Sequence, residues 1–158
     1  TMRAAKSPLD GQIYYSGLTG WQAGATQEGS IQRLRYTGEK GIYLTKAKAR
    51  KNRLQLTFTE PVSSESINKE SFSASAWNYR WSKGYGSPQL KASDPETRGI
   101  DELAIDSLEL SDDGLTLTVQ IPELIPCHNL KLDFAVTGKN GSALSGPVYF
   151  TIHELPES

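Results

Sequence analysis

The most suggestive chemistry in this sequence is a run of aromatic side chains near its midpoint. The four rings of the run are Trp77, Tyr79, Trp81 and Tyr85. Because successive side chains of a strand point to opposite faces, the first three rings share one face if the segment is extended. Such rings stack on the apolar faces of sugars, and Arg80 adds a polar or cation–π contact. These five residues are therefore candidate ligand-binding residues, and the stretch 82–88 is a loop of the kind in which recognition residues lie.

The same rings also have a structural interpretation. Tryptophan and tyrosine are large enough to dominate a small core, with Trp77 as the core tryptophan of a sandwich and the other rings covering it. The sequence leaves both interpretations open. The exposure of the rings distinguishes them, because coplanar, solvent-facing rings favour sugar binding and buried rings favour packing.

Cys127 and His128 form a second candidate site, since adjacent Cys and His side chains can supply a nucleophile and a base or two metal ligands. Neighbours on a strand point to opposite faces, so the two side chains do not converge without a bend. The pattern favours a small buried thiol and a surface imidazole. His153, the other histidine, has no partner at a metal-binding spacing, and a single cysteine excludes an internal disulfide. We expect no transition metal here.

An acidic stretch offers a third candidate. Its carboxylates, opposed only by Arg98, are Asp94, Glu96, Asp101, Glu102, Asp106, Asp112 and Asp113. Loop carboxylates are the ligands that Ca²⁺ prefers, which makes Asp94 and Asp101 candidate calcium ligands. Paired carboxylates also serve glycosidases. No EF-hand spacing is present, however, and the turn at 112–114 accounts for the last two acids, so the sequence favours a solvated loop.

The sequence also contains a short run of basic residues. Five basic residues and no acid occupy positions 46–53. Lys46, Lys48 and Arg50 are two residues apart, which places them on one face of a strand. We interpret this run as a solvated edge strand protected by lysine rather than as a site for an anionic partner.

Composition narrows the classes of function. The chain has 158 residues and a mass of 17.3 kDa, which suits one packed domain with or without an appendage. Its 17 Lys and Arg nearly balance 18 Asp and Glu, whereas nucleic-acid binders usually carry a basic surplus. No apolar run approaches the roughly 20 residues that cross a bilayer, and the first residues have no signal-peptide pattern. We therefore expect no nucleic-acid partner and no membrane span.

The elements that must position these residues have the pattern of strands. The predicted strands are 12–16, 30–36, 54–59, 115–121, 130–136 and 147–153. The polar segment 63–70 accommodates one short helical turn, and Asn140-Gly141 suits a turn with positive φ. Short strands with turn signals about every 8–12 residues predict an all-β sandwich. The apolar positions expected to share one core are Leu56, Phe58, Leu117, Val119, Leu132, Phe134 and Phe150.

Three segments resemble parts of a bacterial immunoglobulin-like domain. They are 54–73, with Leu54–Val62 at its start, 107–124 (SLELSDDGLTLTVQIPEL), and the closing 141–152. This resemblance implies an immunoglobulin-like β-sandwich over residues 41–155. It specifies a fold more than an activity.

A narrower resemblance rests on shorter motifs. They are 10–17, Gly20-Trp21-Gln22, 31–38, Trp77-Asn78-Tyr79-Arg80 and Tyr85-Gly86-Ser87. These residues are similar to the carboxy-terminal region of large secreted proteins of environmental bacteria, in which a sugar-dehydrogenase-like β-propeller precedes an immunoglobulin-like domain and cytochrome c modules are often attached. The resemblance implies that residues 1–40 form an N-terminal β-hairpin segment similar to the end of a propeller blade. No Cys-x-x-Cys-His motif is present, so we expect no covalent haem and no cofactor in this chain.

Together these resemblances imply a non-catalytic accessory or scaffold module of a larger extracytoplasmic, multidomain protein, periplasmic or secreted. Its expected partners are the neighbouring domains of that protein. The alternative is a carbohydrate-binding module that uses the aromatic run as a platform, with a glycan as the partner. Under either interpretation we expect that this chain is not an enzyme.

Overall fold

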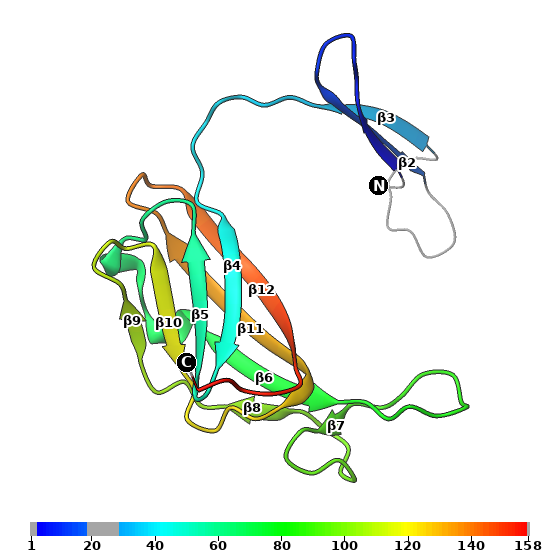
Figure 1. Ribbon diagram of the computed structural model, residues 1–158, viewed down its shortest axis with the longest axis vertical. Helices are drawn as coiled ribbons and strands as arrows, with labels where there is room; N and C mark the ends of the chain where they lie inside the picture. The colour runs from blue at the N-terminus through cyan, green and yellow to red at the C-terminus, as the bar shows by residue number, and fades with distance from the viewer. Residues whose placement is uncertain (1–2, 19–28, 158) are drawn as a thin grey trace. The chain divides into compact units, whose positions relative to one another are not determined.

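The computed structural model describes residues 3–18 and 29–157, so the Gly20-Trp21-Gln22 motif lies outside the described residues. Strand accounts for 49% of the structure and helix for 4%, which makes the fold all-β as predicted. The chain divides into two compact units, Thr1–Glu39 and Lys40–Ser158. Each unit has its own sheets and is described by itself (Figure 1).

The N-terminal unit is a three-stranded antiparallel sheet. Its strands β1 (Arg3–Lys6), β2 (Ile13–Leu18) and β3 (Gly29–Leu34) lie in the order β1-β2-β3. The sequence predicts only β2 and β3. The additional strand pairs with β2 from Arg3 opposite Ser16 to Lys6 opposite Ile13. None of residues 3–17 and 29–39 is buried.

One sheet of the second unit has four strands. They are β4 (Leu44–Arg50), β5 (Arg53–Phe58), β9 (Leu108–Leu110) and β10 (Thr116–Gln120), in the order β4-β5-β10-β9. Along β5 the buried residues Leu54, Leu56 and Phe58 alternate with half-buried polar ones. Because a strand's side chains alternate between its two faces, the apolar side of this sheet turns inward.

The second sheet has five strands, and it positions the aromatic run. They are β6 (Ser73–Asn78), β7 (Leu90–Lys91), β8 (Asp101–Leu103), β11 (Cys127–Thr137) and β12 (Ala143–Ile152). The order is β12-β11-β6-β7, and β8 also pairs with β6. Between β5 and β6, two 3-10 turns, Ser64–Ser66 and Lys69–Ser71, occupy the polar segment where one helical turn is predicted.

The two sheets enclose one hydrophobic core. Six of the seven predicted core residues are buried in it: Leu56, Phe58, Leu117, Val119, Leu132 and Phe134. Phe150 is half-buried and packs against the same cluster. The period-two register predicted for these strands is therefore confirmed.

The neighbour order can be compared with known sandwich topologies. Lettered A to G in chain order, with β7 and β8 as a C′ edge, the sheets run A-B-E-D and G-F-C-C′. Immunoglobulin-type sandwiches pair their strands in this order. Membership of the bacterial immunoglobulin-like family stays a prediction, because strand order describes a topology and not descent.

None of the helices in the described part of the chain is long and apolar enough to cross a membrane.

The turn between β9 and β10 depends on a glycine. Gly114 has φ +74°, and a Cβ there would lie 3.1 Å from Cβ of Pro61. We expect Gly114→Ala to lower the free energy of unfolding by about 2–3 kcal/mol, since left-handed backbone strain and crowding add. Gly141→Ala is the matched control: its φ is +83° but no atom lies within 4 Å of the added Cβ. It should cost about 1 kcal/mol. Equal losses in urea denaturation would show that crowding at Pro61 contributes nothing.

Candidate functional site

The aromatic run lies where β6 ends and a long connection to β7 begins. We call residues 79–89 the aromatic loop. Strand β6 ends at Asn78, and the pairs Trp77–Lys91 and Asn78–Leu90 close the base of the loop. The loop then extends away from the body of the sandwich (Figure 1). Strand alternation determines the side of the sheet on which Trp77 lies. It does not determine the directions of Tyr79 and Trp81, because β6 ends before Tyr79.

The base of the aromatic loop is fastened to the start of β11. The backbone N–H of Tyr79 donates to Nδ1 of His128 at 3.1 Å, and the N–H of His128 donates to Oδ1 of Asn78 at 2.8 Å. The Tyr79 and His128 rings are also in contact, with centroids 4.4 Å apart and planes tilted by 49°. Two hydrogen bonds and a ring contact therefore fix the direction in which the loop leaves the sheet.

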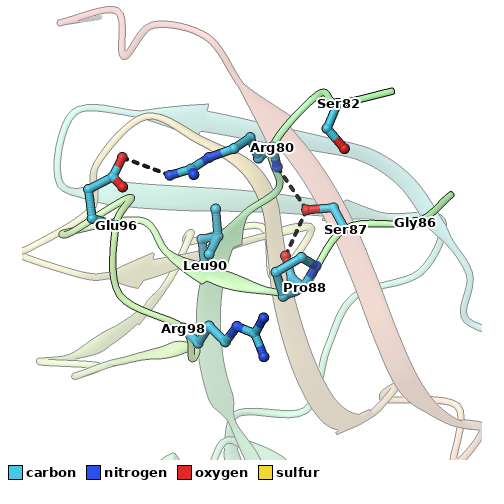
Figure 2. A pocket seen from close by; sticks show the side chains of 8 residues that line it. All are labelled: Arg80, Ser82, Gly86, Ser87, Pro88, Leu90, Glu96 and Arg98. Carbon is cyan, nitrogen blue, oxygen red and sulfur yellow. Dashed lines mark hydrogen bonds and ion pairs between the residues drawn. The ribbon is translucent and has the colours of Figure 1, made fainter. Parts of the chain in front are cut away.

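Arg80 ties the two arms of the loop together and links them to the next turn. Its backbone N–H donates to Oγ of Ser87 at 2.8 Å. Its Nη2 lies 2.7 Å from Oε1 of Glu96 in an ion pair, which Figure 2 shows beside Leu90. Both charged side chains are more than half exposed, so the pair contributes geometry more than stability.

The rings beyond the base face solvent. Trp81 is 93% exposed, Tyr85 is fully exposed and Tyr79 is 49% exposed. Trp77 is half-buried on the outer side of its sheet, because the inward positions of β6 belong to Ala74 and Ala76. The interpretation of Trp77 as the core tryptophan of the sandwich is therefore wrong.

Two adjoining hollows lie along the loop. The larger has a volume of about 380 Å³ and is lined by Tyr79, Arg80, Trp81, Ser82, Gly84, Gly86 and Ser87. The smaller has a volume of about 200 Å³ and is lined by Arg80, Ser82, Gly86, Ser87, Pro88, Leu90, Glu96 and Arg98 (Figure 2). Together they place aromatic surface, hydroxyl groups and guanidinium groups along one connected surface. Three of the five predicted site residues, Tyr79, Arg80 and Trp81, line the hollows, whereas Trp77 and Tyr85 line neither.

Sequence reasoning missed the residues that the fold adds to this surface. Glu96 and Arg98 are 16 and 18 residues from Arg80 in the sequence, and the pairing of β6 with β7 brings them alongside it. The one feature of the sequence that could have pointed to this surface is Arg98, because it is the one basic residue within the acidic stretch.

The candidate calcium ligands each hold part of their own loop. Asp94 accepts hydrogen bonds from Oγ1 of Thr97 at 2.6 Å and from the N–H of Glu96 at 3.2 Å, and these bonds lower its pKa. Asp101 accepts from the N–H and Oγ of Ser93 at 2.7 and 2.9 Å. Desolvation opposes the ionisation of Asp101, but these two bonds, the charge of Lys91 and a backbone hydrogen bond from Ala92 together outweigh it, so its pKa is lowered as well. Residues 3–18 and 29–157 contain no group of three or more His, Cys, Asp or Glu arranged to hold a metal ion.

The side chains of Cys127 and His128 point to opposite sides of β11, as expected of neighbours on a strand. The thiol is buried and the imidazole is exposed. Burial raises the pKa of Cys127 to about 11, which makes the thiol a poor nucleophile near neutral pH. His153 lines the same hollow as these two residues, a proximity that the sequence spacing does not predict.

Comparisons with known proteins add no family to this geometry. No family model matches the chain, and a search of the curated proteins found no match.

Proposed function

We propose that this chain is a non-catalytic binding module whose aromatic loop recognises a glycan. The observation that carries the proposal is the exposure of Trp81 and Tyr85 on a loop whose base is fixed. Exposed single apolar residues are common on protein surfaces. Here two large rings lie on one loop beside a hollow of about 380 Å³, a combination typical of a recognition surface.

The chemistry of the hollow suits a sugar. A pyranose has an apolar face that stacks on an indole and a rim of hydroxyl groups that need hydrogen-bond partners. Trp81 supplies the ring, while Ser82, Ser87 and the guanidinium of Arg80 supply polar atoms from the same lining. The ion pair with Glu96 supports the orientation of Arg80. A stacking ring with polar groups beside it is the arrangement that sugar recognition needs.

The charged groups of the two hollows support a non-catalytic role. Their lining contains one carboxylate, Glu96, and that carboxylate already pairs with Arg80 at 2.7 Å. Glycoside hydrolysis by the usual route requires two carboxylates placed on either side of the bond that is cleaved. The surface is thus equipped to hold a sugar and lacks the pair that would hydrolyse it.

A scaffold role within a larger extracytoplasmic protein is the second proposal, and the N-terminal sheet favours it. Ile13 and Leu34 are opposite each other in the pairing of β2 with β3, and on their shared face they are 40% and 58% exposed. A small sheet gains independent stability by packing an apolar face against something else. We propose that a neighbouring domain covers Ile13 and Leu34, as the resemblance to propeller-containing secreted proteins implies.

The glycan proposal is tested by Trp81→Ala. Affinity electrophoresis of the full chain through gels that contain xylan, mannan or hydroxyethylcellulose identifies a binding polysaccharide. On that polysaccharide the variant should lose about 1–2 kcal/mol of affinity, the contribution of one stacked ring, with an almost unchanged melting temperature.

Tyr149→Ala is the control, because Tyr149 is a 60% exposed ring on β12 and does not line the hollow. It should bind as the parent chain does. A large loss of stability in Trp81→Ala with unchanged binding would refute the glycan proposal and leave the scaffold proposal standing.

A further inference from the structure

A row of cations lies on the outer side of the four-stranded sheet. Strand β4 is an edge strand of that sheet, as the sequence predicts. Its Ala47 and Ala49 pack against the core, so Lys46, Lys48 and Arg50, which alternate with them, point outward. Because alternate residues of a strand are about 6.7 Å apart, the three cations form a regularly spaced row.

The neighbouring strand extends this row with one more cation. In the register of β4 with β5, Lys46 is opposite Thr57, Lys48 is opposite Gln55 and Arg50 is opposite Arg53. The next strand, β10, continues the outer side with uncharged side chains: Thr116, Thr118 and Gln120. We call Lys46, Lys48, Arg50 and Arg53 the cationic face.

Two acids of the same unit, Glu109 and Glu157, interact with other residues. Glu109 lies on β9, at the far edge of the sheet, and its Oε1 is 3.4 Å from Nε2 of Gln120. Glu157 pairs at 2.6 Å with Lys51, in the turn of the hairpin. No described residue makes an ion pair of 4.0 Å or less with any of the four cations. The face therefore presents positive charge without a counterion among residues 3–18 and 29–157.

Two features of this face are unfavourable in the protein alone. Arg50 and Arg53 are directly opposite each other, and like charges at such positions repel. In addition, Nε of Arg53 is buried and has no hydrogen-bond partner among the described residues. A bound anion would relieve the first of these, because it screens the repulsion between the two guanidinium groups and accepts hydrogen bonds from their accessible N–H groups.

The sequence alone favours edge protection for this run, but the geometry of the folded sheet adds a second role. We propose that the cationic face is a docking surface for an anionic polysaccharide, whose carboxylate or sulfate groups bind Lys46, Lys48, Arg50 and Arg53. A linear polymer with regularly repeated anionic groups matches a regularly spaced row of cations. Nucleic acid fits less well. The outward positions of β4, β5 and β10 carry no aromatic ring on which a base could stack, and a flat sheet face has no element that enters a groove.

This surface is separate from the aromatic loop. The cationic face belongs to the four-stranded sheet, and the aromatic loop leaves the five-stranded one. The net charge of the chain is −1, so the attraction is local to this face rather than a property of the whole molecule. Binding here and binding at Trp81 can therefore be tested independently.

The test compares two double variants of the full chain. Lys46→Gln/Lys48→Gln removes two exposed cations of the face, and Lys40→Gln/Lys139→Gln removes two exposed lysines elsewhere with the same change in charge. Binding to dextran sulfate and to polygalacturonate is measured over a range of salt concentrations. Neutral dextran and a DNA oligonucleotide of equal total charge serve as comparison ligands.

We expect the parent chain to bind at least one of the two anionic polymers and not neutral dextran. Lys46→Gln/Lys48→Gln should weaken that binding about tenfold or more, with a plot of log affinity against log salt shallower by about two, one for each cation removed. The control double variant should bind like the parent. The proposal is overturned if neither polymer binds, if both double variants lose affinity equally, or if DNA binds more tightly than the polysaccharides.

Discussion

Replacing Phe134 by Ala lowers the free energy of unfolding by about 3–5 kcal/mol. Phe134 lies in the middle of β11 and is buried where the two sheets meet. Its ring centroid is 6.2 Å from that of Phe58, on the opposite sheet, and 6.4 Å from that of Phe72. Truncation removes the ring from both contacts and leaves a cavity that the paired strands cannot close. Urea denaturation followed by circular dichroism measures the loss.

Tyr149→Ala is the matched control for this measurement. It removes an aromatic ring from β12, the strand next to β11, but the ring is 60% exposed. We expect a loss of under about 1 kcal/mol, as for surface substitutions that open no cavity. If the two variants lost similar amounts, Phe134 would not be a member of a close-packed core.

The thiol of Cys127 reacts with iodoacetamide about a hundredfold more slowly in the folded chain than in the unfolded one at pH 8. Burial raises its pKa from the ordinary 9.0 to about 11. The thiolate is the reactive form. At pH 8 about one molecule in ten carries it in the unfolded chain, and about one in a thousand carries it in the folded chain. Because the chain has one cysteine, mass spectrometry of the alkylated protein reports this residue alone.

The same reaction in urea supplies the reference rate for an exposed thiol. The folded protein should keep gaining reactivity steeply as the pH rises from about 10 to 11, where the thiol of the unfolded chain is already almost fully ionised. A folded rate within a few-fold of the unfolded rate at pH 8 would contradict burial of the thiol and would reopen a nucleophilic role for Cys127.

Most of the sandwich could be predicted because its longer strands each bury one face. In β5, β10 and β11 the apolar residues recur at every second position, and this period fixes both the strand and its inward side. β1 has no such signal, since all four of its residues are exposed and it exists by pairing with β2. Short strands that bury little carry no periodic pattern to detect.

The segment 103–110 shows another limit of periodicity. Its apolar residues form no single strand, because Leu103 ends β8 in the five-stranded sheet and Leu108 begins β9 in the four-stranded one. Ile105, between them, is buried where the chain crosses from one sheet to the other. Which sheet a three-residue strand joins depends on its partners, and those partners are remote in the sequence.

The aromatic loop, too, could be predicted from the sequence only in part. Residue type singles out Trp81 and Tyr85, but the position of Trp77 depends on a register that the two inward alanines of β6 decide. The polar partners of the loop, among them Ser87 and Arg98, come from chain segments that only the folded hairpin brings alongside Arg80. Such a site can be located from the sequence, but its lining cannot.

The hydrogen bond that anchors the aromatic loop also selects the tautomer of His128. Nδ1 of His128 accepts the N–H of Tyr79, so in the neutral ring this nitrogen carries no hydrogen. The ring proton is then on Nε2, which acts as a donor and has no lone pair for a metal ion. For Nε2 to become a metal ligand, the proton would have to move to Nδ1 and oppose the N–H that it now accepts. While the loop is anchored, His128 can therefore offer a hydrogen bond to a neighbour through Nε2, but that nitrogen cannot coordinate a metal.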